Sequence, residues 1–258
     1  MDLFDLSGKV ALIPGSSRGI GRAIAEAYAA RGARVVISSR KQDACDGVAA
    51  AINAQYGEGR AVAIAASISD KAALEMLVKR TIETFERIDV LVCNAASNPY
   101  YGPMAGISDE QFRKVFDNNV HPNHWLISLV APQMSERRDG AIILISSIGG
   151  LIGSDVIGAY HISKAADIHL ARNLAVEFGP HNIRVNTVAP GVIRTDFARA
   201  LWEAPGAEAA FRKSIPLGRI GEPDEIAGAA VFLGSKAGAY MTGQSIVIDG
   251  GTTIRSSP

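Results

Sequence analysis

Short apolar runs rich in β-branched residues alternate along this chain with longer, alanine-rich segments in which apolar residues recur at helical spacing. The short runs are apolar throughout instead of alternating with polar residues, which is typical of strands buried on both faces of a parallel sheet. We therefore expect an α/β fold, a single doubly wound parallel sheet with helices on both faces. The expected strands are 9–13, 34–38, 60–65, 88–93, 140–146, 183–188 and 245–248, and the expected helices are 20–31, 42–56, 70–87, one or two within 108–135, 160–178 and 223–233.

The least regular part of the chain is residues 195–215, which include Phe197, Leu201 and Trp202. This segment follows an expected strand end, where ligands bind in doubly wound sheets, so we interpret it as a mobile lid over an active site. A packed pair of surface helices is the alternative. No repeat, low-complexity tract or proline-rich linker interrupts the chain, so residues 1–258 are expected to form one domain that includes this lid.

The composition narrows the range of functions. Lys plus Arg and Asp plus Glu both number 26, so the net charge is zero and no broad attraction to nucleic acid or an anionic membrane is expected. The two cysteines, Cys45 and Cys93, cannot form a disulfide framework, and no signal peptide or apolar run of the ~18 residues needed to span a membrane is visible. We expect a cytoplasmic protein with free thiols.

A glycine-rich loop, residues 15–21 (GSSRGIG), lies between the first expected strand and the first expected helix. Its glycines, Gly15, Gly19 and Gly21, have the spacing GxxxGxG. Glycine adopts positive φ and lets the backbone approach a pyrophosphate, which the N–H groups and positive dipole of the helix start then bind. In this strand–loop–helix setting the loop predicts a dinucleotide site.

The end of the second expected strand indicates which dinucleotide binds. An acidic residue at this place accepts a hydrogen bond from the ribose 2′-hydroxyl, whereas this chain has Ser39 and Arg40. A guanidinium matches a phosphate bidentately, and Arg18 in the glycine-rich loop could reach the same group. These residues favour NADP(H) over NAD(H); the alternative is that Arg40 is a solvated surface charge.

Tyr160 and Lys164 are four residues apart in an expected helix and therefore lie on one face of it. A cation beside a phenol stabilises the phenolate and lowers its pKa toward the range in which an acid–base group works. Such a pair is a weak signal alone. It gains weight from Ser147, 13 residues upstream at an expected strand end, and from Asn119 in the preceding helical region.

Together with CNAA at 93–96, ISS at 145–147 and NTVAPG at 186–191, these motifs resemble the short-chain dehydrogenase/reductase family over essentially the whole chain. Within the family the chain resembles NADPH-dependent carbonyl reductase and retinol dehydrogenase members. The resemblance implies a Rossmann-type sheet, a homotetramer, and a catalytic tetrad of Asn119, Ser147, Tyr160 and Lys164. It implies that Tyr160 exchanges a proton with the substrate, that Lys164 lowers the pKa of Tyr160 and binds the nicotinamide ribose, and that Ser147 donates to the substrate oxygen. Asn119 would hold a water that links Lys164 to solvent.

The resemblance also implies further contacts. Cofactor contacts are expected at Gly15, Ser17, Arg18, Gly19, Ile20, Gly21, Ser39, Arg40, Ser67, Ile68, Asn94, Ala95, Ala96, Tyr160, Lys164, Pro190, Gly191, Val192, Ile193 and Thr195. Candidate substrate contacts are Ser147, Tyr100, Tyr101, Ile148, Ile157, Phe197, Leu201 and Trp202. Four residues depart from the family pattern: Pro14, Ser67, Ala96 and Pro122. His121 and His124 have no evident third ligand, so no metal is expected.

These observations predict an NADP(H)-dependent oxidoreductase that interconverts a ketone or aldehyde with an alcohol on a hydrophobic or aromatic small molecule. The aromatic side chains of the expected lid motivate that substrate class. A 3-oxoacyl-carrier-protein reductase is the alternative within the family. Such an enzyme docks its acidic carrier on two basic residues, and Arg138 matches one of them while His181 stands at the other. A third reading is a member that binds NADP(H) without turnover, which the intact tetrad disfavours.

Overall fold

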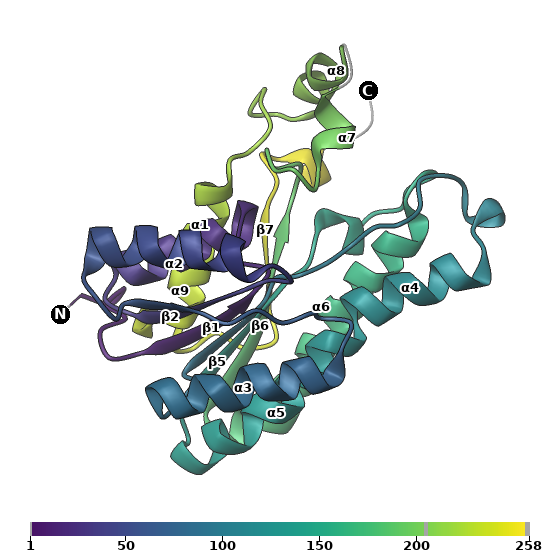
Figure 1. The fold of residues 1–258 in the computed structure, drawn as a ribbon. Coiled ribbons are helices and arrows are strands. Elements are labelled where there is room, and N and C mark those ends of the chain that lie inside the picture. The colour runs from purple at the N-terminus through teal and green to yellow at the C-terminus, as the bar shows by residue number, and fades with distance from the viewer. Residues whose placement is uncertain (1, 204–205, 256–258) are drawn as a thin grey trace.

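Parallel pairing places the first strand of the chain in the middle of one sheet. The computed structural model describes residues 2–203 and 206–255, and within them seven strands pair in the order β3-β2-β1-β4-β5-β6-β7 (Figure 1). The strands are β1 (Val10–Pro14), β2 (Arg34–Ser38), β3 (Ala61–Ala63), β4 (Val90–Cys93), β5 (Gly140–Ile145), β6 (Ile183–Pro190) and β7 (Ser245–Ile248). The order reverses between β1 and β4, and ligands of doubly wound sheets bind beyond the carboxyl ends of the strands at such a switch point. The expected Rossmann-type sheet is confirmed.

Helices cover both faces of the sheet (Figure 1). One face carries α1 (Gly19–Ala30), α2 (Gln42–Tyr56) and α9 (Pro223–Gly234), and the other carries α3 (Lys71–Phe85), α5 (His121–Arg137) and α6 (Gly158–Phe178), with α4 (Asp109–Asn119) packed on α5 and α6. The short helices α7 (Arg199–Trp202) and α8 (Ala207–Ser214) lie beyond the carboxyl ends of the strands. Successive strand residues point to opposite faces, so Ile13 and Ile37 join one apolar core while Leu12 and Val36 join the other.

Capping residues explain where the helix boundaries fall. The expected helical region 108–135 divides at Val120 into α4 and α5, and Pro122 lies in the first turn of α5, where its missing N–H has no helical partner to lose. Ser108 and Gln111 form a capping box at the start of α4, and Asp70 caps α3 by accepting from the Ala73 N–H. The strand expected at 60–65 is shorter than expected, and the strand expected at 183–188 continues to Pro190.

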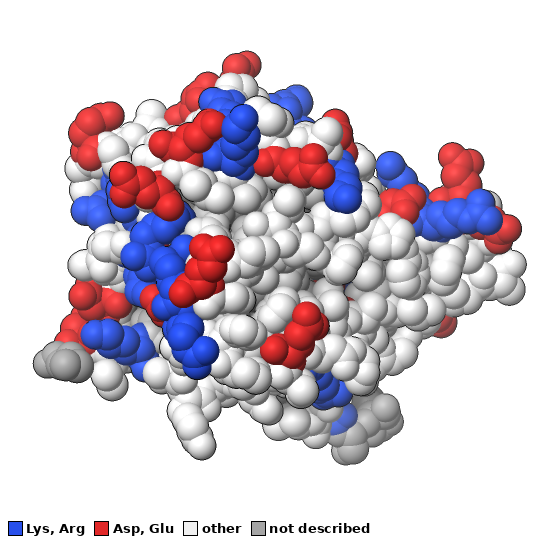
Figure 2. Space-filling view, turned by 90° about the horizontal axis from the view of Figure 1, so that it is seen from below, with Lys and Arg blue, Asp and Glu red and all other residues white. Residues whose placement is uncertain are grey.

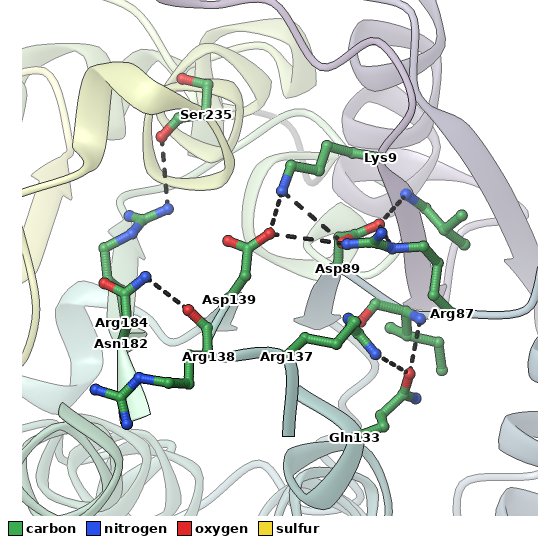
Figure 3. A network of polar contacts seen from close by, with 12 residues as sticks. Lys9, Arg87, Asp89, Gln133, Arg137, Arg138, Asp139, Asn182, Arg184 and Ser235 are labelled. Atoms are coloured by element: carbon green, nitrogen blue, oxygen red, sulfur yellow. Dashed lines mark hydrogen bonds and ion pairs between the residues drawn. The ribbon is translucent and has the colours of Figure 1, made fainter. Parts of the chain in front are cut away.

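A polar network joins the amino ends of the central strands (Figure 3). Asp89, directly before β4, has a side chain only 1% exposed. It accepts from the Val10 N–H at 2.9 Å and from Nε of Arg87 at 2.9 and 3.0 Å. Lys9 donates to Asp139 at 2.6 Å, and its Nζ lies 3.8 Å from Asp89. Opposite charges therefore alternate at the end of the sheet that lies away from the ligand-binding edge.

Charged side chains are unevenly distributed over one face of the molecule. On the face shown in Figure 2, basic side chains form a band toward one side with acidic side chains beside it, and the centre carries few charges. In the part of the chain that the structure describes, no helix has the length and apolar character to cross a membrane. The same residues contain no group of three or more His, Cys, Asp or Glu side chains arranged to hold a metal ion.

Candidate active site

The glycine-rich loop turns at the carboxyl end of β1 and passes directly into α1. Gly15 and Gly19 have φ angles of 81° and 57°, in the region that favours glycine. A Cβ on Gly21 would lie 2.4 Å from the Gly15 carbonyl oxygen and 2.5 Å from Nδ2 of Asn94. Asn94, just after β4, donates to that carbonyl at 2.9 Å. Arg18 at the N-cap makes no side-chain hydrogen bond to the helix, so the first N–H groups of α1 are available to an anion.

The start of the expected lid lies against this loop. A Cβ on Gly19 would meet Cγ2 of Thr195 at 3.2 Å, and Nη1 of Arg18 lies 3.3 Å from the carboxylate of Asp196. Arg194 pairs with Glu208 of α8 at 2.8 Å and with Glu222, before α9, at 3.1 Å. Within the expected lid, Ala204 and Pro205 lie outside the described residues.

Residues 190–195 connect the end of β6 to the expected lid. Pro190 is buried as the last residue of β6, and the Gly191 N–H donates to the Ile248 carbonyl at 2.9 Å. A Cβ on Gly191 would lie 2.8 Å from Cα of Asp249, so β6 and β7 approach closely here. The Val192 carbonyl accepts from the Gly221 N–H at 3.0 Å, and Ile193 is buried. This segment therefore has a fixed path beside the glycine-rich loop.

Four of the expected cofactor contacts, Ser39, Arg40, Ser67 and Ile68, follow the carboxyl ends of β2 and β3. The Ser39 hydroxyl lies 3.1 Å from Sγ of Cys45, and the Ser67 hydroxyl lies 3.0 Å from that of Ser69. Ile68 packs on the core beside them. Arg40 is exposed. Because Arg18 pairs with Asp196, Arg40 is the one of the two expected phosphate-binding cations that has no ion-pair partner among the described residues.

Tyr160 and Lys164 share one face of α6, and Ser147 follows β5 beside them. Nζ of Lys164 lies 5.8 Å from the centre of the Tyr160 ring. Burial raises the pKa of Tyr160 above its usual value, while the Lys164 charge and a hydrogen bond with Ser147 act in the opposite direction. The Ser147 hydroxyl also accepts from the Gly149 N–H at 3.0 Å. The structure thus brings these three side chains together at the carboxyl end of β5.

Asn119 ends α4 and is fully buried. Its Oδ1 accepts from the Ser97 N–H at 2.8 Å, and its Nδ2 donates to the Ser97 carbonyl at 2.9 Å and to the Ser163 hydroxyl at 3.1 Å. These bonds join α4 to the segment after β4 and to α6. Asn119 therefore fixes that segment, which continues from Asn94, Ala95 and Ala96, relative to the helix that carries Tyr160.

The candidate substrate residues differ in how close they lie to Tyr160. The Phe197 ring lies 5.9 Å from the Tyr160 ring, and Tyr101 is close enough to influence its pKa. Tyr100 instead donates to the Pro103 carbonyl of its own loop at 3.0 Å. The Trp202 ring lies under the guanidinium of Arg194, 5.2 Å from the ring centre. Ile148 is buried, whereas Ile157 and Leu201 are half-buried.

The structure adds a residue that we did not expect from the sequence. Asp167 is fully buried, and its Oδ2 accepts from Nζ of Lys164 at 3.0 Å. Its Oδ1 accepts at 2.8 Å from Asn123 on α5. The sequence pattern that could have indicated this residue is an acidic side chain three positions after Lys164, flanked by the apolar residues Ala166 and Ile168.

Comparisons with known proteins agree with this geometry. A family model described as enoyl-(acyl carrier protein) reductase matches residues 15–253. "Dehydrogenase/reductase SDR family member 4" from Rattus norvegicus is 38% identical over 251 residues, which cover 97% of this chain and 89% of that protein. The chain belongs to the short-chain dehydrogenase/reductase family.

Solved structures of short-chain dehydrogenases/reductases share the fold over nearly the whole chain. A member from Mycobacterium marinum is 39% identical, with a TM-score of 0.92 and coverage of 98% of this chain and 99% of that one. A 7α-hydroxysteroid dehydrogenase complexed with NADH and 7-oxo glycochenodeoxycholic acid is 36% identical, with a TM-score of 0.92 and coverage of 97% and 96%. A gluconate 5-dehydrogenase from Burkholderia cenocepacia J2315 in complex with NADP and tartrate is 29% identical, with a TM-score of 0.93 and coverage of 99% of both chains. Family membership thus makes this protein an oxidoreductase with a nicotinamide cofactor, and the choice between NADH and NADPH depends on local residues.

Proposed function

We propose that this short-chain dehydrogenase/reductase is an NADP(H)-dependent enzyme that interconverts a ketone or aldehyde with an alcohol on a hydrophobic or aromatic small molecule. The position of Tyr160 carries the proposal. Its phenol lies beside Lys164 and Ser147 at the same edge of the sheet as the glycine-rich loop. The Tyr160 phenol, the Lys164 ammonium and the Ser147 hydroxyl would therefore lie near the nicotinamide end of a dinucleotide whose pyrophosphate is bound by that loop.

A Cβ at Gly15 or Gly21 would lie too close to neighbouring atoms, so the backbone of the glycine-rich loop is tightly packed here. The first N–H groups of α1 have no side-chain cap and suit a pyrophosphate, so these residues fit a dinucleotide. When bound, the nicotinamide supplies or accepts a hydride. In carbonyl reduction Tyr160 gives its proton to the substrate oxygen, and in alcohol oxidation its phenolate takes that proton. Ser147 donates to the same oxygen as negative charge develops there, and the Lys164 charge favours the phenolate.

Apolar and aromatic side chains around Tyr160 support the substrate class. The Phe197 ring is 5.9 Å from it, and Phe197 and Tyr101 each leave 46% of their surface exposed. Burial of such surface against a substrate contributes about 25 cal/mol per Å². We expect turnover of aromatic ketones and diketones with NADPH, measured by its oxidation. Absence of turnover over a broad panel would count against this substrate class.

Arg40 supports the choice of NADP(H), since it is the exposed cation at the end of β2. A charge-assisted hydrogen bond contributes about 1.5–3 kcal/mol, which is roughly ten- to hundredfold in Kd. Arg40→Glu loses that bond and adds repulsion, so the Kd for NADPH should rise at least about a hundredfold in a fluorescence titration, while the Kd for NADH stays near its original value.

The matched control is Arg172→Glu, the same charge reversal at an exposed position of α6. It should leave both dissociation constants unchanged. Tighter binding of NADH than of NADPH by the wild type, or indifference of NADPH binding to Arg40→Glu, would show that the 2′-phosphate interpretation is wrong.

The 3-oxoacyl-carrier-protein alternative is favoured by one observation. Arg138 donates to the Pro180 carbonyl at 2.8 Å, so it lies next to exposed His181 and offers a basic surface. This surface is at the amino end of β5 (Figure 3), and Ser147 follows the other end of that six-residue strand, roughly 20 Å away. Turnover of an acetoacetyl thioester on an acidic carrier, weakened by Arg138→Glu, would favour this alternative.

The remaining parts of the proposal concern the whole molecule. We propose one domain over residues 1–258 in which residues 195–215 act as the lid, and a cytoplasmic homotetramer. Light scattering coupled to size exclusion measures the oligomeric state directly. Binding of NADP(H) without turnover of any carbonyl or alcohol would instead identify a non-catalytic member of the family.

A further inference from the structure

A buried carboxylate lies beneath the Tyr160–Lys164 pair. Oδ2 of Asp167 accepts from Nζ of Lys164 at 3.0 Å, and the two side chains are 0% and 3% exposed. The second Lys164 hydrogen bond goes to the Ile145 carbonyl of β5 at 2.9 Å. An ammonium group has three donors, so two are used inside the protein and one remains for a ribose hydroxyl or a water.

Burial raises the pKa of Asp167 above its usual value, whereas the Lys164 charge and the hydrogen bonds from Lys164 and Asn123 act in the opposite direction. The geometry of these hydrogen bonds favours the ionised form. Oδ1 of Asp167 accepts at 2.8 Å from Nδ2 of Asn123, which also donates to the Asn119 carbonyl at 2.8 Å. Each carboxylate oxygen thus faces a donor, and neither the ammonium nor the amide nitrogen offers an acceptor for a carboxylic acid proton. A buried carboxylate costs several kcal/mol unless it is paired in this way.

The pair also changes the field that Tyr160 experiences. A lone ammonium group beside the phenol would strongly favour the phenolate. The Asp167 carboxylate lies 3.0 Å from the Lys164 ammonium, so the two charges largely cancel for a group that is farther away than their separation. Burial alone would lower the pKa of Lys164, but Asp167 and Tyr160 raise it above its usual value, so the lysine stays protonated. Lys164 lowers the pKa of the Tyr160 phenol, and the Asp167 carboxylate raises it.

Other titratable groups face this cluster from neighbouring elements. Cys93 of β4 lies near both members of the pair, and burial raises the pKa of its thiol, so it stays neutral. Tyr101 and His161 approach Tyr160 itself, the His161 ring at 6.2 Å. Burial lowers the pKa of His161, which therefore is neutral above pH 7. Among these groups, Asp167 is the one that contributes a negative charge near Tyr160 and Lys164.

We propose that Asp167 is a positioning residue for the proton-transfer site: it holds the Lys164 ammonium against β5 and offsets its charge, and so sets the pH range in which Tyr160 exchanges its proton. This inference rests on the proposed function, because it assigns Tyr160 the acid–base role. It makes Asn123 a supporting residue that orients the carboxylate from α5.

Asp167→Asn tests the proposal, because an amide of nearly the same shape keeps an acceptor oxygen and removes the charge. Alcohol oxidation needs the phenolate, so its kcat/KM rises with pH, and carbonyl reduction needs the phenol, so its kcat/KM falls with pH. In this variant Lys164 keeps its hydrogen bond to the Ile145 carbonyl, but it loses the Asp167 charge that favours its protonated form. As long as Lys164 is protonated, the phenolate is more stable without the offsetting charge. Both midpoints should therefore move to lower pH together, by about one unit.

Two variants serve as controls. Asp167→Glu restores the charge and should return the midpoints to within a few tenths of a unit of the wild type. Glu177→Gln removes an exposed carboxylate from the same helix, roughly 15 Å along it from Asp167 and roughly 25 Å from Tyr160, and should leave the profile unchanged. A loss of folding alone would lower the rates without moving the midpoints.

A second measurement separates failure of this inference from failure of the proposed function. Tyrosinate absorbance is titrated with pH in the presence of saturating NADP⁺, which stabilises the folded state, and the Tyr160→Phe signal is subtracted to isolate Tyr160. This readout needs no substrate. A downward shift in Asp167→Asn supports the proposal even where no substrate is turned over, and an unchanged or raised midpoint overturns it. A shift in the rate profile without a shift in the tyrosinate titration overturns it too, because the rate would then report another group.

Discussion

Asp89→Asn should destabilise the protein without affecting its chemistry. The Asp89 side chain is 1% exposed and accepts hydrogen bonds from Arg87 and from the Val10 N–H (Figure 3). The asparagine side chain keeps one oxygen that can accept from the Val10 N–H, but it has no negative charge to pair with Arg87. Because the residue precedes β4, the strand separates it from the ligand-binding edge.

The size of the loss follows from the exposure of the partners. Breaking a fully buried ion pair costs about 3–5 kcal/mol, and a charge-assisted hydrogen bond contributes about 1.5–3 kcal/mol. Arg87 and Lys9 remain 36% and 33% exposed, so water replaces part of what they lose. We expect a loss of about 3 kcal/mol. For 258 residues the entropy of unfolding is about 0.5 kcal/mol per kelvin, so Tm should fall by about 6 °C.

The assay is thermal unfolding followed by circular dichroism, with NADPH binding measured on the same samples. Asp139→Asn is the control, because Asp139 belongs to the same network but its side chain is 47% exposed. It should lower Tm by about 2 °C or less, as expected of a solvated ion pair. Equal shifts in the two variants would refute the reasoning that burial determines the cost. A weaker affinity for NADPH in Asp89→Asn would refute the separation of the two ends of the sheet.

Two further predictions concern the site. Gly21→Ala should raise the Kd for NADPH by about tenfold or more, because the new Cβ would lie 2.4 Å from the Gly15 carbonyl oxygen and 2.5 Å from Nδ2 of Asn94; binding within about twofold of the wild type would contradict this. Tyr160→Phe should lower kcat by at least about a hundredfold while the Kd for NADPH changes little, since general acid–base catalysis contributes about 10²–10⁴-fold; equal losses in kcat and in cofactor affinity would indicate a structural role instead.

The fold could be predicted because its determinants are local. Buried parallel strands such as β1 and β5 are continuous apolar runs, and α1, which follows β1, has a clear apolar face. The break between α4 and α5 is harder to see, since it depends on a single residue, Val120, and Pro122 is compatible either with a helix interior distorted by proline or with a first turn.

From spacing alone, the site was predictable only where its parts are close in sequence, whereas the roles of Asn119 and Ser147 were inferred from the resemblance to the family. The glycine-rich loop and the pair Tyr160–Lys164 are each contained within seven residues. By contrast, the contact of Arg18 with Asp196 joins residues 178 positions apart, so the sequence suggested a phosphate partner for Arg18 and not an ion pair with the expected lid. Long-range contacts of this kind depend on how loops meet above the sheet, which periodicity does not describe.

The two buried carboxylates illustrate how stability and chemistry are divided in this fold. Asp89 is paired with partly exposed cations at the amino ends of the strands, where its removal should cost stability alone. Asp167 is paired with a lysine that is 3% exposed at the carboxyl ends, so removal of either partner leaves a desolvated charge inside the site itself. A change at Asp167 therefore cannot be read from stability or from rate alone. The position of the pH midpoint is the quantity that responds to its charge and not to its contribution to folding.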